Sequence, residues 1–362
     1  MRFSLLLCLL STVGIQAAEV RTLLATPQTI CWGYYWARAQ PALRIRSGDS
    51  VQIQTVSGNP DRMVAAGVKP VEIQPMLKRI YAEIPPAERG PGPHLLTGPI
   101  YIEEAEPGDT LEVRIQKITM DVPYAYNAFG PTTGVLQDEF PYMRLKIIPL
   151  DRERGVANFG AGIHIPTRPF FGSMGIAPPG EAKLNSGPPW IHAGNMDNKE
   201  LVAGTTLYIP VHQKGALFEV GDGHAGMGNG EVDVTAMETS LTGTFEFIVH
   251  KGAALRWPRA ETPTYYITMG FNEDLTKAAE LAIREMIDFL TTEKHLSRDD
   301  AYMLTSVAVD LDITQLVDGK KGVHALCPKA IFTSSGSEPA GLGRGTLMFI
   351  GDEPRRRQRQ VR

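Results

Sequence analysis

The chain has 362 residues, of which 43% are hydrophobic and 21% are charged, and its formal net charge is −4. These values are typical of an ordinary globular protein, and the length suffices for a large core and one or two domains. The weakly acidic balance excludes a general nucleic-acid-binding surface, so we expect no nucleic-acid partner.

The first 18 residues have the pattern of a cleaved export signal. Arg2 supplies a positive start, residues 3–10 form a short apolar core, and the small residues Ala17 and Ala18 follow. The apolar stretch is too short to span a bilayer comfortably. We therefore predict cleavage near Ala17 or Ala18, a periplasmic or secreted mature protein, and no transmembrane segment after cleavage.

Two cysteines, Cys31 and Cys327, remain in the predicted mature chain. An oxidising compartment permits a disulfide between them, but two cysteines far apart in sequence do not establish one. Two free, buried thiols are the alternative.

Most of the chain shows the apolar–polar alternation of half-buried strands. Residues 51–56 read Val-Gln-Ile-Gln-Thr-Val and residues 111–115 read Leu-Glu-Val-Arg-Ile, each after a Gly-Asp turn. Similar short strands are expected at 206–211, 244–249 and 264–269. Turn residues recur at short intervals, with 36 Gly and 27 Pro in the chain. The pattern predicts a mainly β protein with β-sandwich or barrel-like layers, not alternating βα units.

A small helical addition is expected near residues 272–308. Apolar residues recur at helical spacing over Leu275–Lys294, which predicts the longest helix inside 272–294. A second, short helix should begin at Ser297, which together with Asp300 resembles a capping arrangement. Extended chain should resume over 307–317 and 324–332. Both helices are expected to be structural.

The glycine-rich stretch 221–231 reads Gly-Asp-Gly-His-Ala-Gly-Met-Gly-Asn-Gly-Glu and follows a strand predicted over 205–220. Its glycines allow turns with positive φ. Between them lie Asp222, His224 and Glu231, side chains that can bind a metal or move a proton. This combination indicates a site, with a polar surface hairpin as the alternative. The chain carries neither a Walker motif nor a dinucleotide fingerprint.

Further candidates lie on either side of this stretch. Glu238 follows it, and an ordinary solvated strand carboxylate is its alternative interpretation. His94 lies in a Gly- and Pro-rich loop, where a histidine seldom has a packing reason, although a turn histidine bonded to the backbone is an alternative. Asn195 and Asp197 follow Gly194 and form a carbonyl clamp, a bond to a metal-binding histidine, or an Asx turn. Weaker candidates are His164, His192 and Asp61.

In their order along the chain, these motifs resemble the acetamidase/formamidase family. The segments that carry the resemblance are 92–99 (Gly-Pro-His-Leu-Leu-Thr-Gly-Pro), 169–178, 194–197 (Gly-Asn-Met-Asp), 203–211 and 221–225. The resemblance covers nearly the whole mature sequence and assigns residues 19–350 to one catalytic region. It implies hydrolysis of small carboxamides such as formamide or acetamide, a mostly β fold with a helical addition, and a divalent metal. The chain departs from the family at Met227, where Gln is common, and at Asn229, where Asp is common.

Amide hydrolysis needs an activated water, stabilisation of an oxyanion and protonation of the departing amine. A metal supplies the first two. Aspartate and histidine donors fit zinc, and additional carboxylates tolerate calcium. We predict as metal ligands Asp222, His224, Glu238 and Asp197, and as catalytic residues Glu231, His94 and Asn195. The predicted partner is a small amide substrate, and the sequence is compatible with a homo-oligomer.

A covalent nucleophile has little support. Ser173 lies in Gly-Ser-Met-Gly, which is not a nucleophile elbow, and neither cysteine has a neighbouring motif that marks a thiolate. The alternative to an enzyme is a non-catalytic β-sandwich that binds a metal or a small ligand.

The last segment, 351–362, is strongly basic and contains Arg355, Arg356, Arg357 and Arg359 after Pro354. We expect a flexible, solvated tail. Contact with a membrane surface or a partner is the alternative.

Overall fold

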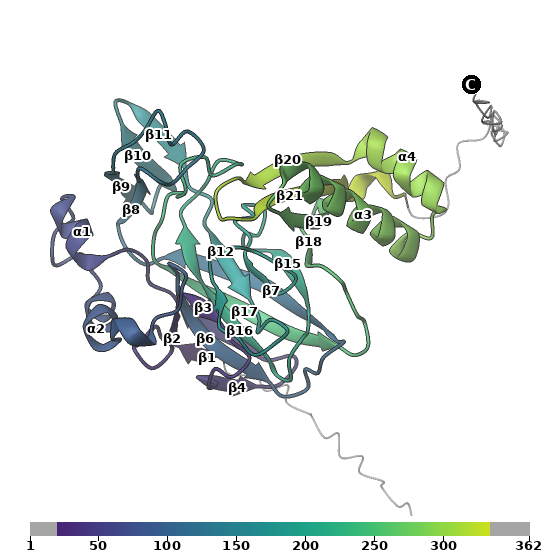
Figure 1. Ribbon diagram of the computed structural model, residues 1–362, viewed down its shortest axis with the longest axis horizontal. Helices are drawn as coiled ribbons and strands as arrows, with labels where there is room; N and C mark the ends of the chain where they lie inside the picture. Colours follow the sequence, from purple (N-terminus) through teal and green to yellow (C-terminus); the bar gives the residue numbers. More distant parts are fainter. Residues whose placement is uncertain (1–19, 334–362) are drawn as a thin grey trace, which may run out of the picture. The chain divides into compact units, whose positions relative to one another are not determined.

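The computed structural model describes residues 20–333, whose regular structure consists mainly of β-strands (Figure 1). The predicted export signal at 1–18 and the predicted basic tail at 351–362 lie outside the described residues. Among the described residues, no helix is long and apolar enough to cross a membrane.

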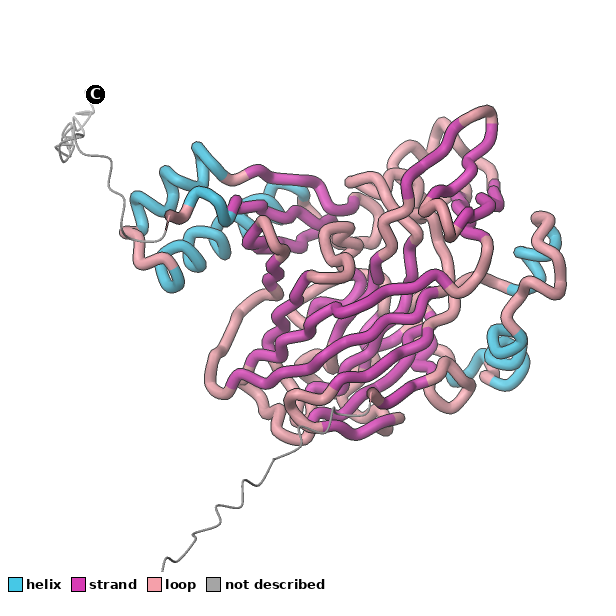
Figure 2. Tube along the Cα trace, turned by 180° about the vertical axis from the view of Figure 1, so that it is seen from behind, coloured by secondary structure: helices cyan, strands magenta, loops and turns pink. Residues whose placement is uncertain are grey.

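The first large sheet has nine strands and is antiparallel except for one pair at its edge, β1 with β5. In spatial order its strands are β1 (Arg21–Leu23), β5 (Ser50–Gln54), β17 (Leu241–His250), β7 (Thr110–Met120), β15 (Thr205–Pro210), β18 (Arg259–Glu261), β19 (Tyr265–Asn272), β21 (Lys321–Pro328) and β20 (Asp310–Gln315). The five short strands predicted from alternation overlap β5, β7, β15, β17 and β19, and three of the predicted ranges run one or two residues past a strand end. The side-by-side strands are visible in Figure 2.

The second large sheet has six strands. They are β14 (Ala193–Asn195), β12 (Phe170–Gly175), β16 (Ala216–His224), β6 (Leu95–Ile102) and β2 (Ile30–Trp32), with β4 (Leu43–Ile45) pairing in parallel with β6. The single strand predicted over 205–220 was wrong, because it divides into β15 and β16, which belong to different sheets. Pro210 has no N–H to continue the ladder, and Gly215 adopts a φ of 77° in the turn between them.

The apolar faces of the two large sheets pack on each other. Phe171 and Phe218 of the second sheet meet Phe245 and Phe247 of the first, with ring centroids 5.4 Å apart for Phe171–Phe245 and 5.0 Å apart for Phe218–Phe247. Each of these rings is fully buried, which contributes roughly 1.5–3 kcal/mol per side chain. This interface confirms the predicted mainly β fold with sandwich layers. Neither sheet closes on itself, because the first and last strands of each are not paired with each other.

Two smaller sheets complete the strands of the described part. One is an antiparallel set of four, β11 (Ile163–Pro166), β10 (Val156–Gly160), β9 (Arg144–Asp151) and β8 (Tyr124–Phe129). The other pairs β3 (Tyr34–Tyr35) with β13 (Leu184–Asn185). Tyr126 in β8 forms an isolated bridge with Glu238, which ties the four-stranded sheet to the segment after β16.

The predicted helical addition is present as α3 (Leu275–Glu293) and α4 (Arg298–Ala308), which lie beside β19 and β21 (Figure 1). Ser297 Oγ accepts a hydrogen bond from the N–H of Asp300, so the predicted cap is confirmed. Gly270 in β19 permits the close approach of α3, because a Cβ there would collide with the carbonyl oxygen of Ala278. The extended chain predicted from 307 begins only at β20, and a short 3₁₀ turn (Lys329–Ile331) follows β21.

Three short helical segments in the region 60–88 were not predicted: α1 (Pro60–Ala65), α2 (Pro75–Glu83) and a 3₁₀ turn (Pro86–Glu88). Each begins with proline, whose missing N–H costs nothing at a helix start. They are too short for a clear 3.6-residue period, which explains the omission. The helices are held by a second apolar cluster that includes Met63, Leu77 and Ile80 together with Trp32 and Tyr124.

Candidate active site

His224 lies at the end of β16 and is completely buried. Its Nε2 atom is 3.1 Å from Glu238 Oε1 and 3.4 Å from Asp222 Oδ2. An isolated bridge between His224 and Glu238 brings the later carboxylate alongside β16. These contacts lack hydrogen-bond geometry, and neither ring nitrogen has a hydrogen-bond partner within the described residues. The imidazole therefore offers an unused donor atom to a carboxylate-lined space.

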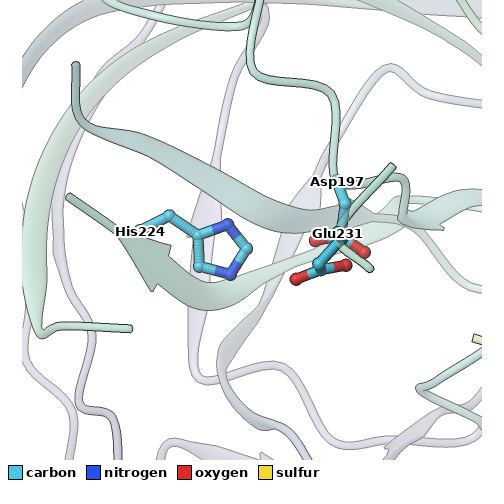
Figure 3. A group of neighbouring side chains, drawn as sticks. All are labelled: Asp197, His224 and Glu231. Atoms are coloured by element: carbon cyan, nitrogen blue, oxygen red, sulfur yellow. The ribbon is translucent and has the colours of Figure 1, made fainter. Parts of the chain in front are cut away.

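A second group of carboxylates faces the same imidazole. One oxygen of Asp197, one oxygen of Glu231 and one nitrogen of His224 all lie within 4.8 Å of one another. Figure 3 shows the ring edge of His224 that carries both nitrogens on the side of the Asp197 and Glu231 carboxylates. Two triads, Asp222–His224–Glu238 and Asp197–His224–Glu231, thus share one histidine.

Three of these acidic residues adopt a left-handed backbone conformation. The φ angles are 50° at Asp197, 55° at Asp222 and 43° at Glu231. Such conformations cost about 1–3 kcal/mol each in a non-glycine residue and cluster at functional sites. These conformations were not predicted, because positive φ was expected at the neighbouring glycines.

Gly172 in β12 leaves the space into which the carboxylates point. A Cβ at this position would overlap Asp197 Oδ1 and Asp222 Oδ2 and would crowd the imidazole of His224. The carboxylates therefore converge on a volume that any other residue would fill. Gly172 lies in segment 169–178, which carries part of the family resemblance, but nothing in its sequence context marked it as a site residue.

His94 approaches from the loop before β6. Its Nδ1 atom lies 3.0 Å from the carbonyl oxygen of Ser186, which can only accept, so the neutral ring carries its hydrogen on Nδ1. Its Nε2 atom lies 3.9 Å from Asp222 Oδ1. The two interpretations of His94 are therefore compatible, since one nitrogen bonds the backbone and the other faces the carboxylates.

Asn195 comes from β14, at the far edge of the second sheet. Its Nδ2 atom donates to Asp197 Oδ2 over 2.8 Å, while its Oδ1 atom is buried without a partner among the described residues. The amide thus orients Asp197 and leaves one acceptor free.

Asp318 is a member of the cluster that sequence reasoning missed. It lies in the turn between β20 and β21, and its neighbour in the site is Asp197. Two backbone bonds hold this region against the glycine-rich stretch, from Gly230 N to the carbonyl of Thr314 and from Leu316 N to the carbonyl of Gly230. A Val-Asp-Gly sequence is typical of an ordinary turn, so no local signal marked Asp318.

The electrostatics of the cluster favour a positive charge at its centre. Burial, reinforced by neighbouring carboxylates, raises the pKa of Asp197, Glu231 and Asp318. Burial also acts to raise the pKa of Asp222, but His224 and His94 outweigh it and hold that pKa below its usual range. Buried carboxylates at this density, with unpartnered imidazole nitrogens between them, suit a divalent cation.

A cavity of about 440 Å³ opens from this cluster. The polar part of the cavity, the inner end, is lined by His94, Asn195, Asp222, Glu231, Glu238 and Asp318. All of the residues predicted from sequence as ligands or catalytic groups therefore lie in or beside one site. Their individual roles stay predictions.

The weaker candidates lie elsewhere. Ser173 is buried and bonded to the hydroxyl of Tyr35 at 2.9 Å, and His192 is buried in an edge-on contact with the same tyrosine ring. His164 is exposed on β11, and Asp61 is exposed in the first turn of α1. Cys31 and Cys327 are both free and buried, which agrees with the alternative of two free thiols and not with a disulfide.

Comparison with known proteins places this site in a family context. The Acetamidase/Formamidase family model matches residues 91–186 and 181–334. A formamidase of Methylophilus methylotrophus is 26% identical over 191 residues, a match that covers 38% of this chain and 47% of the relative. The chain thus spans about half the length of the curated relatives it matches.

Two solved structures resemble the fold over most of their length. One is a recombinant predicted acetamidase/formamidase from the thermophile Thermoanaerobacter tengcongensis, with a TM-score of 0.74, 28% identity, and coverage of 86% of this chain and 97% of that one. The other is an acetamidase from Bacillus halodurans, with a TM-score of 0.72, 29% identity, and coverage of 86% and 98%. Because the family model covers more than half of its residues, this chain belongs to the acetamidase/formamidase family.

Proposed function

We propose that this protein hydrolyses the C–N bond of small linear carboxamides, giving a carboxylate and ammonia. The observation that carries the proposal is the pair of acid–imidazole triads that share His224 and lie beside the inner end of the cavity. Family membership supports the same reaction class.

The site is proposed to hold a divalent cation between His224, Asp222, Glu238 and Asp197. The fit rests on the unpartnered nitrogens of His224, the unpartnered Oδ1 of Asp197 and the open space at Gly172. Imidazole and carboxylate donors suit zinc, while the number of carboxylates also suits calcium. When bound, such a cation supplies Lewis acidity, which lowers the pKa of water and polarises a carbonyl oxygen.

The remaining polar groups then divide the proton transfers and the orientation of the substrate. Glu231 takes the proton of the attacking water and delivers it to the departing nitrogen, since it is buried and lines the cavity. Asn195 Oδ1 accepts a hydrogen bond from the substrate N–H. His94, fixed through Ser186, presents Nε2 as a further donor atom or proton acceptor.

Export is proposed from residues 1–18 alone, by the charge, apolar and small-residue order of that segment. N-terminal sequencing of natively expressed protein tests it. The expected sequence begins after Ala17 or Ala18, and an intact Met1 on exported material would contradict cleavage.

The activity is tested by ammonia release from formamide, acetamide and propionamide, before and after treatment with a chelator. We expect hydrolysis that chelation abolishes and that zinc or calcium restores. His224→Ala should lose bound metal and hydrolysis together, because a methyl group cannot replace an imidazole ligand. His164→Ala, at an exposed histidine, is the matched control. Full activity in metal-free protein would reject the metal while leaving the hydrolase proposal intact.

A further inference from the structure

The cavity is far larger than formamide or acetamide requires. Its volume is about 440 Å³, whereas a single water needs only roughly 10–15 Å³ by the same kind of measure. A second hollow of about 440 Å³ adjoins it and shares Arg62, Ala128, Thr133, Leu145 and Val234 with it. Volumes in the range of roughly 300–1,000 Å³ are typical of sites for drug-sized ligands.

The part of the cavity away from the carboxylates, called the outer wall below, is mostly apolar. Its large side chains are Val56, Met63, Tyr81, Leu95, Tyr126 and Leu145. All six belong to or pack against the apolar cluster that holds α1 and α2. The wall is thus fixed in place and offers an apolar surface to any group bound there.

The outer wall and the inner end come from different parts of the chain. The inner-end residues, from His94 to Asp318, all lie inside the segments that match the family model. Val56, Arg62, Met63 and Tyr81 precede residue 91 and lie outside that match. The chemistry therefore comes from family segments, while much of the outer wall comes from the region of α1 and α2.

Arg62 supplies a cation at the junction of the two hollows. It is exposed, and its guanidinium makes neither an ion pair nor a hydrogen bond with other residues of the described part. It contributes the only charged side chain to the lining of the second hollow in the described structure. A free guanidinium at a cavity mouth is suited to a carboxylate, which it can bind through two parallel hydrogen bonds.

Resting on the hydrolase function proposed above, we propose that the preferred substrate is a primary carboxamide with a bulky apolar acyl group, such as an aromatic ring, that ends in an anionic group. Its amide lies at the inner end, its apolar part against the outer wall, and its anionic end at Arg62. Water adds to the carbonyl carbon, a C–O bond forms, the C–N bond breaks, and a carboxylate and ammonium leave.

The test compares kcat/KM for acetamide, phenylacetamide and 4-carboxyphenylacetamide by ammonia release from the full chain. We expect phenylacetamide to exceed acetamide by at least about 10-fold, since each methylene in an apolar pocket contributes about 10-fold or more. The carboxylated amide should exceed phenylacetamide. Acetamide hydrolysed as well as both aromatic amides would overturn this inference and leave the hydrolase function standing. No hydrolysis of any amide would overturn both.

Two substitutions locate the effect. Ala128→Leu narrows the junction and should lower the phenylacetamide-to-acetamide ratio by about 10-fold, whereas Ala82→Leu on the exposed face of α2 should not. Arg62→Gln should remove the advantage of the carboxylated amide, whereas Arg79→Gln, which is exposed on α2, should not. Unchanged ratios in both Ala128→Leu and Arg62→Gln would overturn the proposed binding mode.

Discussion

The inner end and the outer wall of the cavity are built on opposite physical principles. The inner end gathers carboxylates and His94 beside the buried His224, and two of its acidic residues, Asp222 and Glu231, adopt positive φ. The outer wall consists mainly of apolar side chains held by the packing of two short helices. The comparison shows that bond chemistry and substrate selection occupy separable regions, so substitutions in one region should leave the other largely unaffected.

The largest expected effect is at the inner end. Glu231→Gln keeps the size of the side chain but removes its ability to accept a proton. We expect kcat for the best amide to fall by about 10²–10⁴-fold, the usual contribution of a general base. Ammonia release measures the rate, and thermal unfolding shows whether the fold is kept. Glu153→Gln, at an exposed carboxylate and measured at the same pH, is the control. An unaffected rate in Glu231→Gln would remove Glu231 from the mechanism.

Gly172→Ala tests whether the open space between the carboxylates matters. The added methyl would overlap Asp197 Oδ1 and Asp222 Oδ2 and push both away from their positions. A displacement near 1 Å costs about 10²-fold in rate, so we expect a loss of that order together with weaker metal binding. Gly228→Ala is the matched control in the glycine-rich stretch, because nothing lies near a Cβ built there. Equal rates in the two variants would contradict this geometry.

Ile80→Ala tests the apolar packing that supports the outer wall. Ile80 is completely buried in the cluster that holds α2. The loss of its side chain should lower the free energy of unfolding by about 2–5 kcal/mol. Chemical denaturation measures this, with Val71→Ala, 87% exposed, as a control that should change little. Acetamide hydrolysis by the folded variant should persist, and a loss as large as in Glu231→Gln would break the separation of the two regions.

The smallest expected effect is a loss of stability in acid caused by His192, which is buried against the ring of Tyr35. Burial lowers the pKa of His192 from 6.5 to about 3, so the unfolded chain binds this proton first as pH falls. The contribution of neutral His192 to the free energy of unfolding is therefore fully present above pH 6.5 and falls as the pH drops below that value. The expected loss is about 2 kcal/mol at pH 5. Denaturation at pH 8 and pH 5 should show a smaller difference in His192→Gln than in wild type. Exposed His164→Gln should match wild type, and an identical pH dependence in all three proteins would contradict the assignment to His192.

The sequence alone predicted those features that repeat along the chain. Alternation identified five of the nine strands of the first sheet, and helical spacing with the Ser297 cap identified α3 and α4. Such patterns are visible in the sequence because burial on one side of a strand or helix depends on residues close together in the chain. The glycine-rich stretch and the ordered motifs identified the family and most of the acidic and histidine side chains of the site.

Only the tertiary structure decided what these side chains share. His94 meets Asp222 because β6 pairs with β16, and Asp318 joins the site because the turn after β20 packs near the glycine-rich stretch. The space at Gly172 and the positive φ at Glu231 likewise leave no local pattern. Helices α1 and α2, too short for a period, gain their stability from packing and not from propensity. Distances between residues remote in sequence depend on strand pairing and packing, which no single segment encodes.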